Sequence, residues 1–568
     1  MNPKLTLLTL CALSVCFAAK RLGIRASVYL LAYFTALNVF AQNKYVNSGT
    51  VTETGQTYES IANQAALQVI SNQTLYQGTN ITLSATFDTN NGRYGAYAGN
   101  YGRIELTDSA ITTTGSGGRG VVLTGTATGA LTRVVISTEG DGAHGILPDY
   151  HASVELNDVS ITTSGSDADG IHGAYMNIPV VRFNNLTIVT YGENSQGIAS
   201  EGSGTTLGTS FSGNGLRVTT HGWNAAGLQS SGGVVMDVTD FVIRTDGDRA
   251  RGADRGNSRD SIWHLTSGTI ETSGSGADGF MLHGYGGGET VFTDVVIRTT
   301  GTDAAGIYLS GLGNASSVEH GPVVFNGGSV TATQGLAVRI AGFQNPSLTF
   351  QAGAVVTGDV VAVDSGTNIS GNYDYGYTLN LTDSTLDGAI TNLSPGTDGL
   401  TVNLTQSAVT GDLTGSGTSL TVVTLDDSAL TGDVTANDEA VIIITGSNGG
   451  VIIGDLTGND NAVIDVIVSG SDSAILGDIA QNDDAAVTIT LDTGATGQGG
   501  YHGGNLITGE DSTWTFNKNS HGNYGENHGV WNIGDYEVIF DNMTHTGTVN
   551  LSVNSDTGAG GSITVTGT

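Results

Sequence analysis

The sequence predicts an all-β fold, a single elongated parallel β-helix solenoid of roughly 20 coils. Three observations predict it: an internal repeat of about 25 residues, strand-like alternation within each copy, and abundant glycine with very little proline. The chain of 568 residues contains 86 glycines and 6 prolines. Because a unit of this length cannot bury its own apolar face, the copies must stack on one another.

The first repeat family occurs eight times with the form apolar-x-Thr-x-Gly-x4-Gly, usually followed by an apolar residue. Examples are ITTSGSDADGI from Ile161 and IRTTGTDAAGI from Ile297. β-Branched residues with period-two alternation precede the first glycine and predict a strand. We expect this glycine to end the strand through a positive φ, and the four residues after it to form a turn. The first glycines are Gly115, Gly140, Gly165, Gly192, Gly222, Gly247, Gly274 and Gly301.

A second repeat family follows with a period that is mostly 21 to 23 residues, as in SAVTGDL and SALTGDV. Three of its coils also carry an Asn-Asp pair, which is typical of a turn. The pattern of strand and glycine turn persists, so we predict one continuous helix whose coil cross-section changes near residue 350. The key glycines are Gly358, Gly388, Gly411, Gly432, Gly454 and Gly477.

These patterns divide the chain into five predicted segments. They are a signal segment (1–41), an N-terminal cap with the first coils (42–105), the longer repeats (106–349), the shorter repeats (350–490) and the C-terminal coils (491–568). The stretch 59–70, ESIANQAALQVI, is the one place after the leader where the sequence suggests a helix.

Two hydrophobic stretches precede the first coil, with KRLGIR between them. The second has a basic front and ends in Val39-Phe40-Ala41, which resembles a secretory signal peptide cut after Ala41. A retained membrane anchor is the alternative, although neither stretch reaches the ~18 to 20 apolar residues of a spanning helix. Cys11 and Cys16 both lie in this leader, so the exported chain is expected to lack cysteine.

The formal net charge is −34. Four of the 19 basic residues and none of the 53 acidic residues lie in the leader, which leaves the exported chain at about −38. This balance excludes nucleic acid as a partner, because a phosphate footprint needs clustered Lys and Arg. Strong acidity instead keeps an exposed rod soluble and separate from its neighbours.

Together, the signal peptide, the I-x-T-x-G-x4-G-I coils, the later T-G-D-[LV] coils and the cysteine-free acidic rod resemble the pertactin-like passenger domains of bacterial autotransporters. The resemblance covers residues 45–568. It implies a right-handed helix and display at the outer face of a Gram-negative outer membrane, carried there by a C-terminal β-barrel. The sequence given stops at Thr568 without such a barrel, so we expect either a truncated gene or part of a longer protein.

Histidines near the repeat turns are the strongest hint of catalysis or metal binding. His144, His172 and His283 follow their first glycines by four, seven and nine residues, so we expect them not to stack into one column. The nearby acidic residues are Asp141, Asp167, Asp169 and Asp278. We interpret these histidines as tolerated turn residues and predict no catalytic, cofactor or metal site.

Aspartates recur after the turn glycines of the second repeat family and form a ladder if the coils are in register. Such a ladder favours cations, and calcium binding is left open. The favoured interpretation is that each aspartate forms a turn by bonding its own backbone. These residues are Asp359, Asp412, Asp433, Asp455 and Asp478.

Three further features have structural interpretations. A basic cluster, predicted to lie on one loop between two repeats, contains Arg249, Arg251, Arg255 and Arg259. Aromatic residues near the two ends of the rod are expected to cap it rather than stack on sugars; they are Tyr94, Tyr97, Tyr101, Trp514, Phe516, Tyr524 and Trp531. VDSGT at 363–367 lacks the features of a serine-protease turn, and the glycine-rich 284–289 lacks those of a phosphate loop.

We therefore expect an exported surface rod, an adhesin or a structural stalk without catalysis or cofactor. Its expected partners are glycans or proteins of host or bacterial surfaces. The alternatives are a carbohydrate-active β-helix enzyme, a lyase or hydrolase of polysaccharide, and a scaffold for a functional module outside this sequence. An enzyme acting on a polyanion is disfavoured because only Lys44 and Lys518 are lysines beyond the leader.

Overall fold

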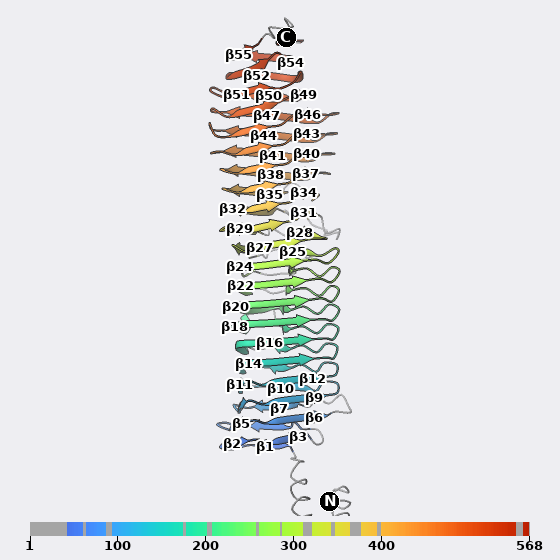
Figure 1. The fold of residues 1–568 in the computed structure, drawn as a ribbon, viewed down its shortest axis with the longest axis vertical. Coiled ribbons are helices and arrows are strands. Elements are labelled where there is room, and N and C mark those ends of the chain that lie inside the picture. The colour runs from blue at the N-terminus through green and yellow to red at the C-terminus, as the bar shows by residue number, and fades with distance from the viewer. Residues whose placement is uncertain are drawn as a thin grey trace, which may run out of the picture.

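The computed structural model describes residues 43–60, 64–86, 94–173, 178–201, 207–256, 261–283, 287–310, 321–341, 347–363, 376–394, 399–552 and 560–566. These residues form one long rod, with β1 to β3 at one end and β52 to β55 at the other (Figure 1). The predicted signal segment and Arg259 lie outside the described residues.

The rod is an all-β solenoid, as the repeats predict. All pairings among the described strands are parallel and join them into one sheet. The described residues contain no helix, so none of them forms a helix that could span a membrane. The suggested helix over 59–70 is wrong where it can be checked, because Leu67–Ile70 is strand β4 and pairs with β1.

Three strands or strand segments form each coil. The first thirteen strands are β1 (Lys44–Val46), β2 (Thr50–Thr54), β3 (Thr57–Glu59), β4 (Leu67–Ile70), β5 (Leu75–Thr79), β6 (Thr82–Thr86), β7 (Tyr94–Gly99), β8 (Arg103–Thr107), β9 (Ala110–Thr114), β10 (Arg119–Leu123), β11 (Thr128–Thr132), β12 (Val135–Glu139) and β13 (Ile146–Pro148).

In the coils that follow, one long bent strand covers two of the three faces and a short strand covers the third. Long and short strands therefore alternate along the chain. These strands are β14 (Ser153–Thr163), β15 (Ile171–Gly173), β16 (Val180–Thr190), β17 (Ile198–Glu201), β18 (Leu207–Thr220), β19 (Leu228–Ser231), β20 (Gly233–Thr245), β21 (Ala253–Gly256), β22 (Ile262–Thr272), β23 (Phe280–His283), β24 (Thr290–Thr299) and β25 (Ala305–Ser310).

From β26 onward the faces are separate short strands again. These are β26 (Val323–Asn326), β27 (Ser329–Ala332), β28 (Leu336–Ala341), β29 (Ser347–Gln351), β30 (Val355–Thr357), β31 (Val360–Val363), β32 (Tyr377–Thr382), β33 (Thr385–Asp387), β34 (Ile390–Asn392), β35 (Leu400–Thr405), β36 (Ala408–Thr410), β37 (Leu413–Gly415), β38 (Leu420–Asp426), β39 (Ala429–Thr431) and β40 (Val434–Ala436).

The C-terminal strands continue the same stack. They are β41 (Val441–Ser447), β42 (Val451–Ile453), β43 (Leu456–Gly458), β44 (Val463–Ser469), β45 (Ala474–Leu476), β46 (Ile479–Gln481), β47 (Ala486–Asp492), β48 (Thr496–Gly499), β49 (Tyr501–His502), β50 (Asn505–Thr508), β51 (Thr513–Phe516), β52 (Ser520–Asn527), β53 (Val530–Gly534), β54 (Glu537–His545), β55 (Thr548–Leu551) and β56 (Ser562–Val565).

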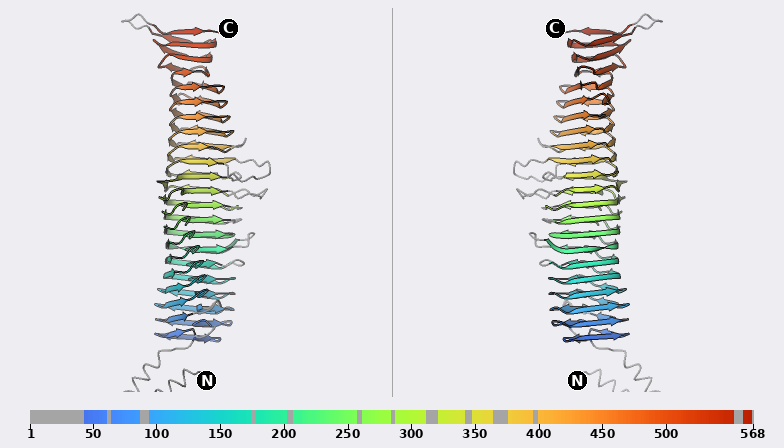
Figure 2. Two further views of the ribbon diagram at one scale, coloured as in Figure 1. Left: turned by 90° about the vertical axis from the view of Figure 1, so that its right-hand side faces the viewer. Right: turned by 90° about the vertical axis from the view of Figure 1, so that its left-hand side faces the viewer.

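One face of the rod shows the stacking most directly. Each strand of this face pairs in parallel with the equivalent strand of the next coil, and the layers follow one another along the rod (Figure 2). The column contains 22 described strands, close to the roughly 20 coils expected: β2, β5, β8, β11, β14, β16, β18, β20, β22, β24, β26, β29, β32, β35, β38, β41, β44, β47, β50, β52, β54 and β56.

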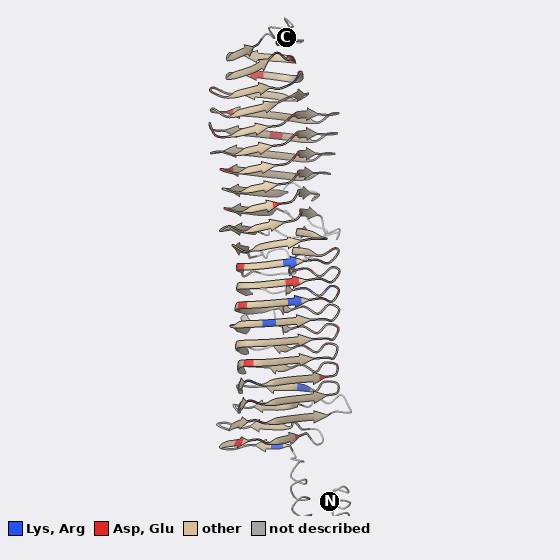
Figure 3. Ribbon diagram, viewed as in Figure 1, with Lys and Arg blue, Asp and Glu red and all other residues tan. Residues whose placement is uncertain are grey.

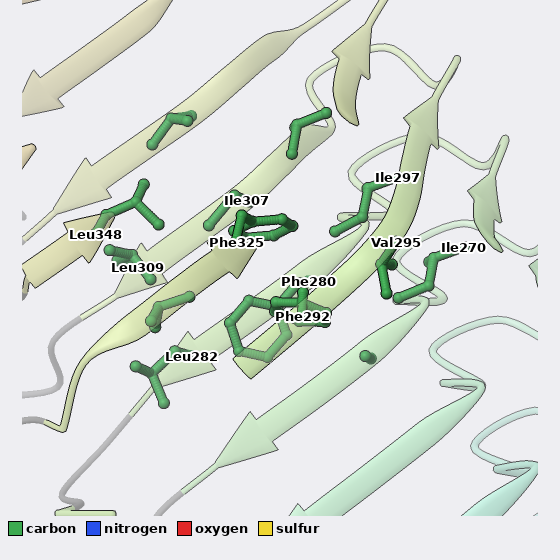
Figure 4. Close-up of a cluster of buried hydrophobic side chains, with 14 of the residues drawn as sticks. Ile270, Phe280, Leu282, Phe292, Val295, Ile297, Ile307, Leu309, Phe325 and Leu348 are labelled. Atoms are coloured by element: carbon green, nitrogen blue, oxygen red, sulfur yellow. The ribbon is translucent and has the colours of Figure 1, made fainter. Parts of the chain in front are cut away.

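Apolar side chains fill the interior as continuous stacks, because alternate residues of each strand point inward. Ile161, Ile188 and Val218 stand in register in successive coils and are fully buried. Aromatic residues of adjacent coils pack on one another where β24 meets β26, and Phe292 stacks on Phe325 at 4.5 Å between ring centroids. Figure 4 shows these rings surrounded by aliphatic side chains from neighbouring coils.

The first glycine of each repeat allows neighbouring backbones to approach closely. A Cβ on Gly165 would lie 1.8 Å from the carbonyl oxygen of Gly140, and one on Gly222 would lie 1.7 Å from that of Gly192. The expected positive φ occurs only at Gly115 and Gly140 among the eight first glycines. The expectation was therefore wrong for the other six copies, where steric contact between coils is what demands glycine.

The positive φ lies two residues later, within the turn. Asp167, Asn194, Asn224 and Asp303 adopt φ values between 50° and 57° at this position. Asn and Asp tolerate the left-handed region better than other side chains, which explains the polar turn composition. Arg249 occupies the same position with φ 55°.

In all eight copies of the first repeat family a threonine stands two residues before the first glycine, and the structure shows why. In seven copies the buried threonine donates its hydroxyl to the carbonyl oxygen five residues later, as from Thr163 to Ala168 at 2.6 Å. This bond satisfies a carbonyl that the turn would otherwise bury without a partner. In the eighth copy the hydroxyl of Thr299 is buried and makes no such bond.

Gly222→Ala is expected to force two coils apart and to destabilise the turns around it by about 3 kcal/mol or more. The matched control is Gly446→Ala, whose added Cβ would lie 3.3 Å from a methyl group of Val468 and no closer than 3.5 Å to any backbone atom, so a small shift of the Val468 side chain relieves the contact. Thermal unfolding and hydrogen exchange of both variants test this. Equal behaviour of the two variants would contradict the steric explanation.

Thr163→Val is expected to lower the local opening free energy by about 1 to 2 kcal/mol, because it leaves the carbonyl of Ala168 unpaired. Thr299→Val removes a hydroxyl that has no partner and should be neutral or stabilising. Hydrogen exchange at the two turns measures the difference. A larger loss at Thr299 than at Thr163 would refute the assigned role of the hydroxyl.

Candidate functional site

Two columns of side chains run side by side along one edge of the first repeat family. The turn column holds the fourth residue after each first glycine: Arg119, His144, Asp169, Gln196, Ala226, Arg251, Asp278 and Ala305. The face column holds residues of β15, β17, β19, β21, β23, β25 and β28 that stand in register: His172, Ala199, Gln229, Asp254, Met281, Tyr308 and Arg339.

Side chains of the turn column bind the backbone of the next coil. The N–H of Asp169 donates to Nδ1 of His144 at 3.1 Å, and the N–H of Gln196 donates to Oδ1 of Asp169 at 2.7 Å. Likewise, the N–H of Ala305 donates to Oδ1 of Asp278 at 2.8 Å. Polar residues in this column therefore have a structural task, whatever else they do.

The structure brings together His144, Asp169 and His172. The two imidazole rings stack with centroids 4.4 Å apart and planes 18° apart. Nδ1 of His172 lies 2.7 Å from Oδ2 of Asp169, and Nδ1 of His144 lies 3.5 Å from the same oxygen. His144 and His172 stand in different columns, as their spacing predicts, but the sequence did not reveal that their rings contact each other across the two columns.

His144 is kept neutral in this cluster. Burial lowers its pKa to about 2, and the positive charges of His172, when protonated, and of Arg119 act in the same direction. Since Nδ1 accepts the N–H of Asp169, the proton of the neutral ring resides on Nε2. Donor atoms of all three residues lie within 4.8 Å of one another, a set that could hold a metal ion.

A second cluster forms around Asp254, three coils farther along the rod. Its carboxylate contacts Nε2 of His283 at 2.9 Å and Nη1 of Arg251 at 3.0 Å. Burial acts to raise the pKa of Asp254, but the hydrogen bonds from His283 and Arg251 outweigh it and the pKa is lowered. A Cβ on Gly256 would lie 2.5 Å from His283, so glycine there makes room for this ring.

Asp278 belongs to the same cluster but has the opposite protonation behaviour. Burial raises its pKa to about 6, with the N–H of Ala305 and the positive charge of Arg251 opposing the shift. Arg251 thus lies between an ionised carboxylate and one that titrates near neutrality, 3.8 Å from the latter. Carboxylates with diverging pKa values are typical of acid–base sites, but both side chains here are almost fully buried.

The basic cluster does not form one loop patch. Arg249 lies in a turn with its guanidinium 6.0 Å from the ring of Trp223, and Arg251 bonds Asp254. Arg255 is fully buried and donates to Thr290 and to the carbonyl oxygens of Ser261 and Gly287. Burial lowers its pKa to about 10. The prediction of a single exposed patch was therefore wrong.

The aspartate ladder of the second repeat family is a hydrogen-bonded column. Oδ1 of Asp433 accepts the N–H of Asp455 at 2.9 Å, and Oδ1 of Asp455 accepts the N–H of Asp478 at 2.8 Å. Asp359 and Asp412 bind the next coil in the same way. The expectation that each aspartate bonds its own backbone was wrong, since the partner is the following coil; calcium binding stays an open question.

Charge is distributed unevenly along the rod. After Arg339, Lys518 is the only basic residue of the sequence, and it pairs with Asp478. Figure 3 shows the sparse Lys and Arg residues on one face of the rod, mostly in its N-terminal half. The charged side chains of the described C-terminal half are therefore almost all acidic.

Three of the four aromatic residues predicted to cap the C-terminal end lie inside the rod, whereas Tyr524 is half-buried and its hydroxyl bonds Glu526 and Thr544. Trp514 and Trp531 are fully buried, and Phe516 packs between them with centroids 6.4 and 5.9 Å away. They cannot offer ring faces to a sugar. Near the other end, Tyr94 stacks on Tyr97 at 5.6 Å and Tyr101 is exposed. The serine motif from 364 onward and residues 284–286 lie outside the described residues.

Sequence reasoning missed Asp254 and the pairing of Asp169 with both histidines. The signal was present in the spacing: positions four and seven after the first glycine are three residues apart and adjacent in space. Reading both positions across neighbouring coils would have grouped His144, Asp169 and His172.

Comparison with solved structures shows a similarity in fold. The chain is similar to a chain in the cryo-EM structure of the Vag8–C1 inhibitor complex, with 18% identity over 85% of this chain and 98% of that chain and a TM-score of 0.38. No protein-family model and no curated protein matches the sequence. The fold therefore rests on the strand register described above.

Asp278→Asn is expected to raise the melting temperature at pH 8 and to leave it nearly unchanged at pH 3.5. With a folded pKa of about 6 against 3.8, ionisation opposes folding progressively as pH rises through this window, by up to about 3 kcal/mol above it. Asp141→Asn is the control, because its exposed carboxylate also accepts a backbone N–H, from Ser166. A melting-temperature gain for Asp278→Asn that is the same at both pH values would contradict this assignment.

Proposed function

We propose that this protein is an exported rod displayed at the surface of a Gram-negative bacterium, similar to the pertactin-like passenger domains of autotransporters. In this proposal it acts as an adhesin or structural stalk without catalysis. The observation that carries the proposal is the solenoid itself, in which 22 described strands of one face pair in unbroken succession. Such a scaffold supplies length and a repetitive outer surface rather than an enclosed cleft.

Surface chemistry supports the same role. An acidic rod with one basic residue after Arg339 remains soluble outside the cell and repels other copies. Glycans or proteins of host cells or neighbouring bacteria are the proposed partners. If the protein continues beyond the sequence given, an outer-membrane barrel is the proposed carrier.

The near-complete burial of Asp254 and Asp278 argues against the carbohydrate-active alternative, because a general acid must reach the glycosidic oxygen. Their side chains support the rod from within the polar columns. The proposal therefore assigns no catalytic residue among the described side chains.

Intact cells of the bacterium that encodes the chain provide the test of display. Antibodies against the rod should label unpermeabilised cells, and externally added protease should remove the label. Deletion of the gene should reduce attachment to glycan- or protein-coated surfaces. Label that appears only after permeabilisation would overturn the proposed location.

Purified rod tests the absence of catalysis. Incubation with pectin, alginate or glycosaminoglycans, with and without calcium, should yield no shortened products. Products that disappear in Asp278→Asn or His172→Ala would establish the enzymatic alternative instead.

A further inference from the structure

We propose that His144, Asp169 and His172 form a binding site for one divalent transition-metal ion, with Zn²⁺ as the best fit. The inference is independent of the rod's proposed surface role. Two imidazoles and one carboxylate are a donor set that suits Zn²⁺ and leaves one position for water. Calcium and magnesium prefer sites built only of oxygen, so they fit this set poorly.

The donor spacing agrees with the size of the ion. Tetrahedral Zn²⁺ with bonds of about 2.1 Å requires donors about 3.4 Å apart. Nδ1 of His144 and Oδ2 of Asp169 are 3.5 Å apart. Nδ1 of His172 is 2.7 Å from the same oxygen because a proton lies between them, and the ion would take the place of that proton. The proton of the neutral His172 ring then resides on Nε2.

Surrounding bonds orient the ligands before an ion arrives. Oδ1 of Asp169 accepts the N–H of Gln196, so Oδ2 is the oxygen directed at the histidines. Nδ1 of His144 carries no proton, but its one lone pair accepts the N–H of Asp169, so an ion can bind this nitrogen only where that hydrogen bond breaks. The hydrogen bond from Gln196, which fixes the orientation of Asp169, is typical of the partners that orient metal ligands.

Besides the hydrogen bond at Nδ1 of His144, two features oppose binding and set a limit on affinity. The rings are nearly parallel, so one ion cannot lie in both ring planes at once, and His172 must turn out of the stack. His172 is the most exposed of the three side chains, at 18%, and provides both this movement and a path from solvent. Arg119, one coil earlier in the turn column, repels a cation.

Arg119 makes the proposal sharply testable. In calorimetric titration of the cysteine-free rod with Zn²⁺ alone, the wild type should show a saturable binding phase with a stoichiometry of one ion per chain. His172→Ala should weaken this phase at least 10-fold, whereas Arg119→Gln should strengthen it several-fold by removing the positive charge. His221→Ala is the matched control, because His221 pairs with Asp246 at 2.8 Å but offers only two donors; it should leave the phase unchanged.

A second readout checks that folding is intact. Zn²⁺ should raise the melting temperature of the wild type and of His221→Ala, but not that of His172→Ala, whose own melting temperature without Zn²⁺ should stay close to wild type. Binding that is unaffected by His172→Ala, or lost in His221→Ala, would overturn the site. The absence of a saturable phase in the wild type would overturn it as well.

Discussion

Close contact between the backbones of successive coils is the constraint on which the whole rod depends. At the repeat turns, a glycine of one coil lies against the carbonyl oxygen of the glycine below, at distances that leave no room for a Cβ. The same contact recurs in the second repeat family, where a Cβ on Gly477 would lie 1.9 Å from the oxygen of Gly454. Parallel strand pairing on the faces can continue only because the turns stack this closely.

A second device recurs at several turns whose side chain can accept a hydrogen bond. An oxygen or nitrogen of that side chain accepts the N–H of the equivalent residue one coil later, in the turn column and in the aspartate ladder alike. Each bond pairs a backbone group that has left the strand ladder. Asp, Asn, Gln and His can all serve, which explains why the turns vary in sequence while the strands keep their register.

The repeat period, the parallel solenoid and the approximate number of coils could be predicted from the sequence, because they depend on periodicity alone. The stacked pair His144 and His172 could not, because it depends on how far the chain turns between two strands. Arg255 was expected in a loop between two repeats, yet three oxygen acceptors hold it inside the rod, where charged residues are rare. Local patterns did not reveal acceptors supplied by residues up to 35 positions away.

In-register stacking of equivalent turn residues is the central claim, and spin-label distances test it most directly. With Cys11 and Cys16 replaced by serine, the pair Ser116/Ser275 spans six coil steps and Ser116/Thr302 spans seven, all at exposed positions that follow a first glycine. At one strand spacing per coil the distances should be about 29 and 34 Å, with narrow distributions that differ by one step. Broad distributions, or two distances that do not differ by one strand spacing, would contradict the account.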